Sequence, residues 1–266
     1  TVIVQTEADL ERFVAAASLA GVTGLHVEGT SADDMRTELV GIACAHALGQ
    51  AWYVPLGHGT AEKQEALELD MGGGQDPAAS AQIPVDRAVA ILKPLLEDPG
   101  VLKIGHTIKS AVKILARAGI TVAPIDDIML LSFTLGGGRD SHDGADIAQR
   151  LFDVSPTARK DLLGSGKSAL AFADAPLEDA AKLAGEAAEL ALRAQATLRS
   201  ELVADSMVGI YETIERPLIP VLAAMERRGV KVDPKALAAL SKDFAKRMAD
   251  LEAEVFRLAG REFNVG

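Results

Sequence analysis

The stretch LVGIACAHALGQAWYVPLGH, residues 39–58, decides the fold that we expect. It contains two apolar runs, Leu39 to Ala47 and Ala51 to Pro55, with Leu48-Gly49-Gln50 between them. Two apolar runs joined by a short turn that contains glycine are typical of a β-hairpin. Trp52 and Tyr53 lie in the second run, which favours a place in the core over a role as stacking platforms for bases. The sequence therefore predicts a hairpin with at least one buried face.

Helices and strands are expected to alternate on both sides of this hairpin. Upstream, apolar residues at helical spacing predict a helix over 7–20, and a strand follows over 23–27. Residues 57–81 are rich in Gly, Ala, Gln and Asp and are expected to form a mobile surface excursion. Downstream, the pattern predicts a helix over 85–97, a strand over 101–104, a helix over 108–118 and a strand over 120–123. Such alternation after a hairpin favours an α/β layer with a mixed sheet.

The remainder of the chain is expected to be mostly helical. Helices are predicted over 126–134, 143–152 and 176–199, followed by a helical pattern over 207–228. Pro217 and Pro220 are expected to kink or break that last helix. Asp233-Pro234 is a good start signal for a long amphipathic helix to about residue 258. We place a domain boundary near residue 205, which gives regions 1–205 and 206–266.

The overall composition limits the classes of function. A net charge of −11 argues against strong nucleic-acid binding by this chain alone, because contacts to phosphate groups need basic residues. The single cysteine, Cys44, excludes an internal disulfide and is expected to be buried in a protein of the reducing cytoplasm. No apolar run approaches the roughly 20 residues that span a bilayer, so no membrane partner is expected. Because the chain begins at Thr1 without a signal peptide, we expect it to be part of a longer polypeptide.

Four strings in register carry a family resemblance. They are the stretch already quoted, AVAILKPLLEDPGVLKIGHTIK at 88–109, IERPLIPVLAAMERRGVKVD at 214–233 and LAGREFNVG at 258–266. Together they resemble the proofreading-exonuclease region of a bacterial family A DNA polymerase I. The resemblance implies a ribonuclease-H-like exonuclease fold for 1–205, a mixed β-sheet flanked by helices. It also implies a truncated, helical start of the polymerase region over 206–266, whose polymerase active site lies beyond this chain. The implied partners are the remainder of the polymerase chain and, in the full-length protein, DNA.

The resemblance also implies where an active site would lie. An active member would use two Mg²⁺ ions about 4 Å apart to hydrolyse the terminal phosphodiester, and such ions require several carboxylates. The family pattern is an Asp-x-Glu on the first strand, an Asp after an Asn-containing turn, and a Tyr-x-x-x-Asp on a late helix. In this register Glu28 is the sole surviving carboxylate. The degenerate positions are His26, Thr107, Ala111, Leu183 and Ala187. We therefore expect no bound cofactor and an inactive, structural domain.

Other side chains offer alternatives to this interpretation. Substitute carboxylates for a rebuilt metal site could come from Glu186, Glu189, Asp33, Asp34, Asp126, Asp127, Asp143 or Asp146. For Asp126 and Asp127, capping of the following helix is the favoured interpretation. His26 and Glu28 share one face of a strand and are either a remnant of the old cleft or a new metal or acid–base pair. His106, His142 and Lys109 either contact phosphate or, as favoured here, are ordinary surface residues.

Three functions follow from these alternatives. The first is an inactive exonuclease domain that supports a neighbouring polymerase in DNA replication and repair. The second is an active or repurposed two-metal 3′-5′ exonuclease that uses substitute carboxylates. The third is a non-catalytic module that binds single-stranded DNA.

Overall fold

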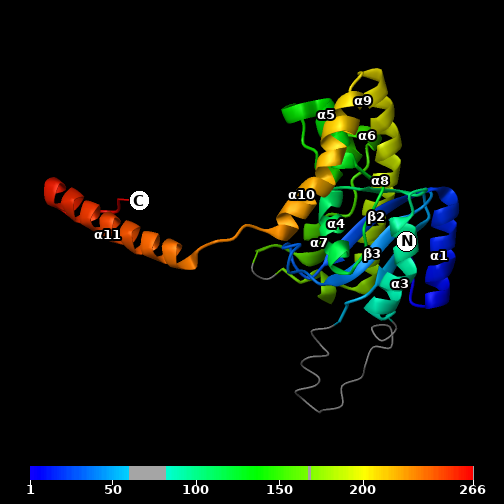
Figure 1. Cartoon of the computed structure of the whole chain (residues 1–266), viewed down its shortest axis with the longest axis horizontal. Coiled ribbons are helices and arrows are strands. Elements are labelled where there is room, and N and C mark those ends of the chain that lie inside the picture. Colours follow the sequence, from blue (N-terminus) through cyan, green and yellow to red (C-terminus); the bar gives the residue numbers. More distant parts are fainter. Residues whose placement is uncertain (60–81, 167–168, 266) are drawn as a thin grey trace, which may run out of the picture. The chain divides into compact units, whose positions relative to one another are not determined.

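The computed structural model describes residues 1–59, 82–166 and 169–265, and Figure 1 shows the whole chain. The chain divides into two compact units, Thr1–Arg227 and Arg228–Gly266. Most of the predicted excursion over 57–81 lies outside the described residues.

A six-stranded mixed sheet forms the centre of the first unit, with the strand order β1-β4-β3-β2-β5-β6. The strands are β1 (Val2–Ile3), β2 (Val22–Gly29), β3 (Leu39–Ala45), β4 (Ala51–Pro55), β5 (Leu102–Gly105) and β6 (Ile125–Asp127). The β3–β4 pair is antiparallel, which confirms the predicted hairpin, and β2 also pairs antiparallel with β3. The pairs β1–β4, β2–β5 and β5–β6 are parallel. The expected α/β class with a mixed, helix-flanked sheet is confirmed.

Helices cover both faces of the sheet (Figure 1). They are α1 (Glu7–Ala20), α3 (Val85–Glu97), α4 (Ile108–Arg117), α5 (Ile128–Gly136), α6 (Gly144–Phe152), α7 (Arg159–Leu163) and α8 (Leu177–Ala204). Apolar residues of α1, α3 and α4 pack in one core cluster with Leu25, Ile42 and Trp52 of the sheet. Residues of α7 and α8 pack in a second cluster with Val40, Ala43 and Tyr53. Trp52 and Tyr53 are neighbours on β4 and belong to different clusters, so the two clusters lie on opposite faces of the sheet.

The last helices of the first unit continue the chain beyond α8. They are α9 (Val208–Ile210), a π-helical segment (Tyr211–Glu215) and α10 (Arg216–Arg228). The predicted break at Pro217 or Pro220 is not observed, because helical residues continue without a gap from 208 to 228. The alternative, a kink at these residues, stays a prediction. Pro217 is the second residue of α10, which follows the π-helical segment without a gap, and Pro220 is accommodated inside α10.

The prediction of a strand over 120–123 is also wrong. Those four residues pair with no strand, and the neighbour of β5 is β6, which begins at Ile125. Ile120 and Val122 are nevertheless buried in the first core cluster. Their alternating apolar pattern therefore reflects packing against helices and not strand pairing. The next helix also begins later than predicted, at Ile128, because Asp126 and Asp127 belong to β6.

The second unit contains the long helix α11 (Pro234–Ala259). Its predicted start is confirmed, because Oδ1 of Asp233 accepts hydrogen bonds from the backbone N–H groups of Lys235 and Ala236. Within the described ranges, no helix is both long and apolar enough to cross a membrane.

Candidate active site

The first-strand motif lies on the face of β2 that is opposite to Leu25. His26 and Glu28 are two residues apart and therefore point to the same face. Nε2 of His26 lies 2.9 Å from Oε1 of Glu28. Glu28 is only 5% exposed, whereas the His26 side chain is 26% exposed. The predicted proximity of these two side chains is confirmed, and their hydrogen bond joins them into one pair.

A third side chain completes this cluster, and the sequence did not predict it. Nη1 of Arg159 donates to both carboxylate oxygens of Glu28, at 2.6 Å to Oε1 and 2.8 Å to Oε2. Its guanidinium carbon lies 5.1 Å from the centroid of the Phe172 ring, a cation–π distance. Arg159 begins α7, which has five residues and is too short for a periodic apolar pattern. No signal in the sequence joins Arg159 to a partner 131 residues earlier in the chain.

The charge of Glu28 is stabilised by these neighbours. Burial by itself raises the pKa of the Glu28 carboxyl, but the hydrogen bonds and charges of His26 and Arg159 outweigh burial. The pKa of Glu28 therefore lies below its ordinary value, and the group is ionised at neutral pH. An ionised carboxylate only accepts hydrogen bonds, so Nε2 of His26 must carry the proton that it donates.

Glu28 lies in a groove with a volume of about 630 Å³. The groove is lined by His26, Val27, Glu28, Gly29, Thr30, Ser31, Ala32, Asp34, Ser110, Ile114, Arg159, Lys160, Leu163, Gly164, Ala169, Leu170, Ala171 and Phe172. Among these described residues the carboxylates are those of Glu28 and Asp34. Asp34 forms an ion pair of 2.9 Å with Nζ of Lys113.

The second motif of the resemblance contributes no acid to this groove. Thr107 precedes α4 with a left-handed backbone, φ 51°, and its N–H donates to Oδ1 of Asp127. Ala111 is 7% exposed and packs in the first core cluster. Their helix reaches the groove through Ser110 and Ile114, neither of which carries a carboxylate.

The third motif lies on α8, which packs closely against the sheet. Leu183 is 8% exposed and belongs to the second core cluster, where the family pattern has a tyrosine. Ala187 is half-buried on the same helix and carries no ligand. Neither residue lines the described groove. The structure therefore brings together His26 and Glu28 but does not place Thr107, Ala111, Leu183 or Ala187 in the same lining.

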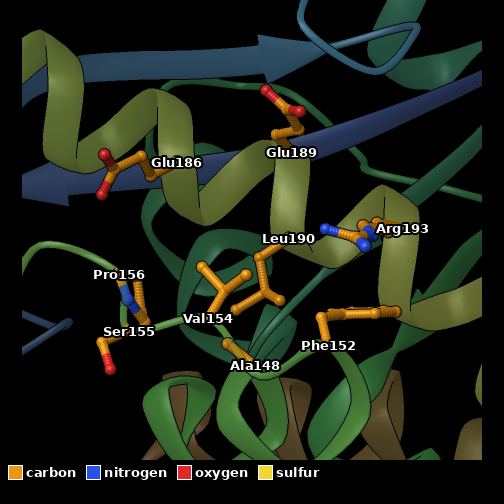
Figure 2. Close-up of a pocket in the computed structure, with 9 residues that line it drawn as sticks. All are labelled: Ala148, Phe152, Val154, Ser155, Pro156, Glu186, Glu189, Leu190 and Arg193. Carbon is orange, nitrogen blue, oxygen red and sulfur yellow. The ribbon is translucent and has the colours of Figure 1, made fainter.

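The nearest substitute carboxylates on α8 face a different pocket. Figure 2 shows Glu186 and Glu189 at a pocket of about 210 Å³, together with Phe152 and Arg193. Oε2 of Glu186 accepts the Thr157 N–H at 2.8 Å, and Oε1 of Glu189 accepts the Gly49 N–H at 2.9 Å. Both carboxylates thus hold backbone segments, and neither lines the groove of Glu28.

Asp126 and Asp127 have structural partners. Oδ1 of Asp127 accepts the Met129 N–H at the start of α5, so the predicted cap is confirmed for this residue. Asp126 does not cap that helix. It instead accepts hydrogen bonds from Nε2 of Gln195, at 2.8 Å, and from the Tyr211 hydroxyl, at 3.2 Å.

Asp33, Asp143 and Asp146 do not line the groove of Glu28. Asp33 accepts the Met35 N–H in a turn, Asp143 precedes α6, and Asp146 is in the first turn of α6. In the described part of the chain, no group of three or more His, Cys, Asp or Glu residues is arranged to hold a metal ion. The Mg²⁺ that the family implies therefore does not fit the donors present around Glu28.

The remaining candidates have local partners. Nε2 of His106 hydrogen-bonds the His142 carbonyl at 2.8 Å, and Nδ1 of His142 lies 2.8 Å from the Ser132 hydroxyl. Lys109 pairs with Glu226 at 2.6 Å. Trp52 and Tyr53 are fully buried, which confirms the prediction that they belong to the core. Cys44 is also buried, and burial raises the pKa of its thiol to about 12, so it is not a nucleophile at neutral pH.

Known proteins match this fold and these sequence motifs. A family model described as 3′-5′ exonuclease matches residues 1–203. The chain is 38% identical to DNA polymerase I of Rhizobium leguminosarum over 97% of its length, and 32% identical to DNA polymerase I of Pseudomonas aeruginosa over 99%. It spans 25% and 28% of those two proteins, so about a quarter of their length is represented.

Solved structures share the fold at lower identity. The POL domain of Pol1 from M. smegmatis, in complex with DNA primer-template and dNTP, has a TM-score of 0.70 and 22% identity. That match covers 99% of this chain and 38% of the other. Brucella melitensis NrnC bound to pGG has a TM-score of 0.59 and 18% identity, over 82% and 91% of the two chains. The sequence matches and the mixed, helix-flanked sheet show that the chain belongs to the 3′-5′ exonuclease family, in the form found in DNA polymerase I.

Proposed function

We propose that this chain is a catalytically silent 3′-5′ exonuclease domain that serves as a structural part of a DNA polymerase I. The observation that carries the proposal is the charge pairing in the groove. Its two described carboxylates, Glu28 and Asp34, are both already paired with basic side chains. A divalent cation would therefore have to compete with Arg159 for Glu28 and with Lys113 for Asp34.

The chemistry of the reaction supports this proposal. Hydrolysis of a phosphodiester with two metal ions requires the ions to activate water and to stabilise the leaving oxygen. Hard cations such as Mg²⁺ prefer several oxygen ligands, but Ala111 and Ala187 offer only methyl groups, and His26 offers a nitrogen. Without those ions the groove lacks the divalent charge that would stabilise the transition state, and the charge of Arg159 is already paired with Glu28.

The structural role follows from what the chain retains. Its sheet and helices bury three extensive core clusters, although Glu28 is the sole surviving carboxylate of the family pattern. In the proposed role the domain supports the remainder of the polymerase chain, which would carry out DNA synthesis in replication and repair. DNA would be a partner in that full-length context. The proposal places the protein in the cytoplasm, where the free Cys44 thiol would stay reduced.

A nuclease assay tests the proposal directly. The purified chain and its Glu28→Ala variant are incubated with 3′-labelled single-stranded DNA and either Mg²⁺ or Mn²⁺. We expect equal background release from the two proteins. Metal-dependent release by the native chain that Glu28→Ala abolishes would overturn the proposal and favour a nuclease with substitute carboxylates.

A binding titration separates the third function. Single-stranded DNA is titrated at low and at moderate salt, because contacts to phosphate groups give a steep salt dependence. We expect no binding at moderate salt by a chain whose net charge is −11. Tight binding that weakens steeply with salt would favour a DNA-binding module instead.

A further inference from the structure

We infer that Arg159 is an internal substitute for the divalent cation, compensating the charge of Glu28 as a metal ion would in an active family member. The inference rests on the proposed function, because it assumes that the native groove holds no metal. It goes further by assigning to Arg159 the charge compensation that a metal ion would otherwise provide. It also predicts that Asp side chains restored at positions 26, 111 and 187 will not bind metal ions tightly while Arg159 is present.

The burial of Glu28 creates the need for a cation. Its side chain is only 5% exposed, and an ionised carboxylate without a partner is strongly unfavourable in such surroundings. Both oxygens are satisfied, one by His26 and Arg159 together and the other by Arg159. The carboxylate therefore carries its charge without a metal ion.

The geometry fixes Arg159 in this role. One nitrogen, Nη1, spans both carboxylate oxygens, while the guanidinium lies against the ring of the buried Phe172. The helix that carries it, α7, is anchored by Leu163, which is 8% exposed and packs in the second core cluster. A planar guanidinium between a carboxylate and an aromatic face is better held than a flexible ammonium group would be.

This pair differs from the ordinary surface ion pairs of the chain. Arg36 and Asp33, for example, are separated by 3.5 Å and are 87% and 53% exposed. Such pairs contribute little, because water screens them. The Arg159–Glu28 pair has one buried partner, although the Arg159 side chain is 53% exposed to the groove. We therefore expect a measurable but moderate coupling.

His26 supports the same interpretation. At this position the family resemblance implies a second carboxylate, which would attract a cation. Here a hydrogen-bond donor lies 2.9 Å from Glu28 instead. His26 and Arg159 together convert a cation-binding pair of acids into an internally compensated cluster.

A double-mutant cycle tests the inference in the native chain. Glu28→Gln, Arg159→Gln and the double variant are compared by urea unfolding. We expect the two residues to be coupled by about tenfold in the unfolding equilibrium constant, which corresponds to about 1.4 kcal/mol. Lys160→Gln is the matched control, because Lys160 is the next residue of α7 and lines the same groove. Lys160 should show less than twofold coupling to Glu28, and additive effects of Glu28 and Arg159 would overturn the inference.

A metal-binding experiment tests the substitution itself. The acids are restored by His26→Asp, Ala111→Asp and Ala187→Asp, with Arg159 either kept or changed to Ala, and Mn²⁺ binding is measured by electron paramagnetic resonance. We expect at least tenfold tighter Mn²⁺ binding when Arg159 is removed, and no change with Lys160→Ala. Equal Mn²⁺ affinity with and without Arg159 would overturn the inference.

The two proposals fail separately. If the carboxylate-restored chain does not fold, as judged by circular dichroism, the cycle in the native chain decides the inference. Glu28-dependent nuclease activity of the native chain would overturn the proposed function. Additivity in the cycle without nuclease activity would overturn only the role of Arg159.

Discussion

A carboxylate in a protein interior keeps its charge only where neighbouring groups replace the hydration that it has lost. Glu28 meets this condition through His26 on its own strand and Arg159 on α7. The contact with His26 could be predicted, because the strand period of two puts both side chains on one face. The contact with Arg159 could not, because its position depends on the path of residues 153–159 after α6. At the residue scale, the loss of metal ligands stays a prediction from the family pattern, and the sequence did not predict the group that compensates Glu28.

The lowered pKa of Glu28 predicts a dependence of stability on pH. The folded-state pKa lies below the value of 4.5 that is usual for this group, so the folded state binds fewer protons than the unfolded state in this pH range. The stabilisation that ionised Glu28 gives to the folded state is fully present above the pKa of Glu28 in the unfolded state. It is lost as the pH falls through the pKa of Glu28 in the folded state. We expect the stability advantage of the native chain over Glu28→Gln to be largest near pH 7 and to shrink below about pH 4.5.

Urea unfolding between pH 3 and pH 7 measures this difference. Glu201→Gln is the control, because Glu201 is exposed on α8. Its difference from the native chain should stay small across the range. An advantage over Glu28→Gln that persists undiminished at the acid end would contradict the predicted linkage.

At the scale of elements, the contact between α8 and β2 determines how the site is built. The buried face of α8 is formed largely by small residues: Ala180, Ala181, Ala184, Gly185, Ala188, Ala191 and Ala194. A Cβ atom on Gly24 of β2 would lie 1.9 Å from the carbonyl oxygen of Ala188. The backbones therefore approach too closely for any side chain at Gly24. This close contact holds α8, with Leu183 and Ala187, against the sheet.

Gly24→Ala is expected to destabilise the fold. The added methyl group meets backbone atoms of α8, which cannot move aside as a flexible side chain can. We expect the free energy of unfolding to fall by about 2–3 kcal/mol, in the range of overpacked cores. Denaturant unfolding monitored by circular dichroism measures the effect.

Gly209→Ala is the matched control for that substitution. A Cβ atom at Gly209 meets nothing within 4 Å, and its backbone has no positive φ. We expect a stabilisation of about 0.4–1 kcal/mol, because alanine is favoured over glycine at an exposed helical position. If Gly24→Ala did not destabilise the fold, the close approach of the α8 and β2 backbones at Gly24 would be contradicted.

Most elements were predictable because their patterns are local. The hairpin β3–β4, the helix α3 and the capped start of α11 follow from alternation, helical spacing and an Asp-Pro start signal. The segment 120–123 was mistaken for a strand, because burial among helices produced the same alternation as strand pairing. The two-residue strand β1 and the five-residue helix α7 are too short to leave a periodic signal.

At the scale of the whole molecule, the family match and the compact unit end at different places. The family model ends at residue 203, close to the predicted boundary near 205, whereas the compact unit continues to Arg227. Tyr211 and Ile219 are fully or almost fully buried and belong to the core clusters of the first unit. Glu226 also pairs with Lys109 and Lys113 of α4. The sequence placed the boundary where the family pattern changes, but packing across that boundary depends on contacts between residues about 100 positions apart.

A pair of truncations tests whether residues 206–227 belong to the folded unit. In the full chain, the Tyr211 hydroxyl accepts a hydrogen bond from the Asp127 N–H and donates one to Asp126. The chain 1–205 lacks this hydroxyl, so Asp126 and Asp127 each lose a buried hydrogen-bond partner. It also exposes the apolar surface that Tyr211 and Ile219 cover, and each such side chain is worth about 1.5–3 kcal/mol. We expect the chain 1–205 to be less stable than the chain 1–227 by about 3–5 kcal/mol in urea unfolding. Equal denaturation midpoints for the two truncations would show that the unit ends near residue 205 after all, and that α10 adds nothing to its core.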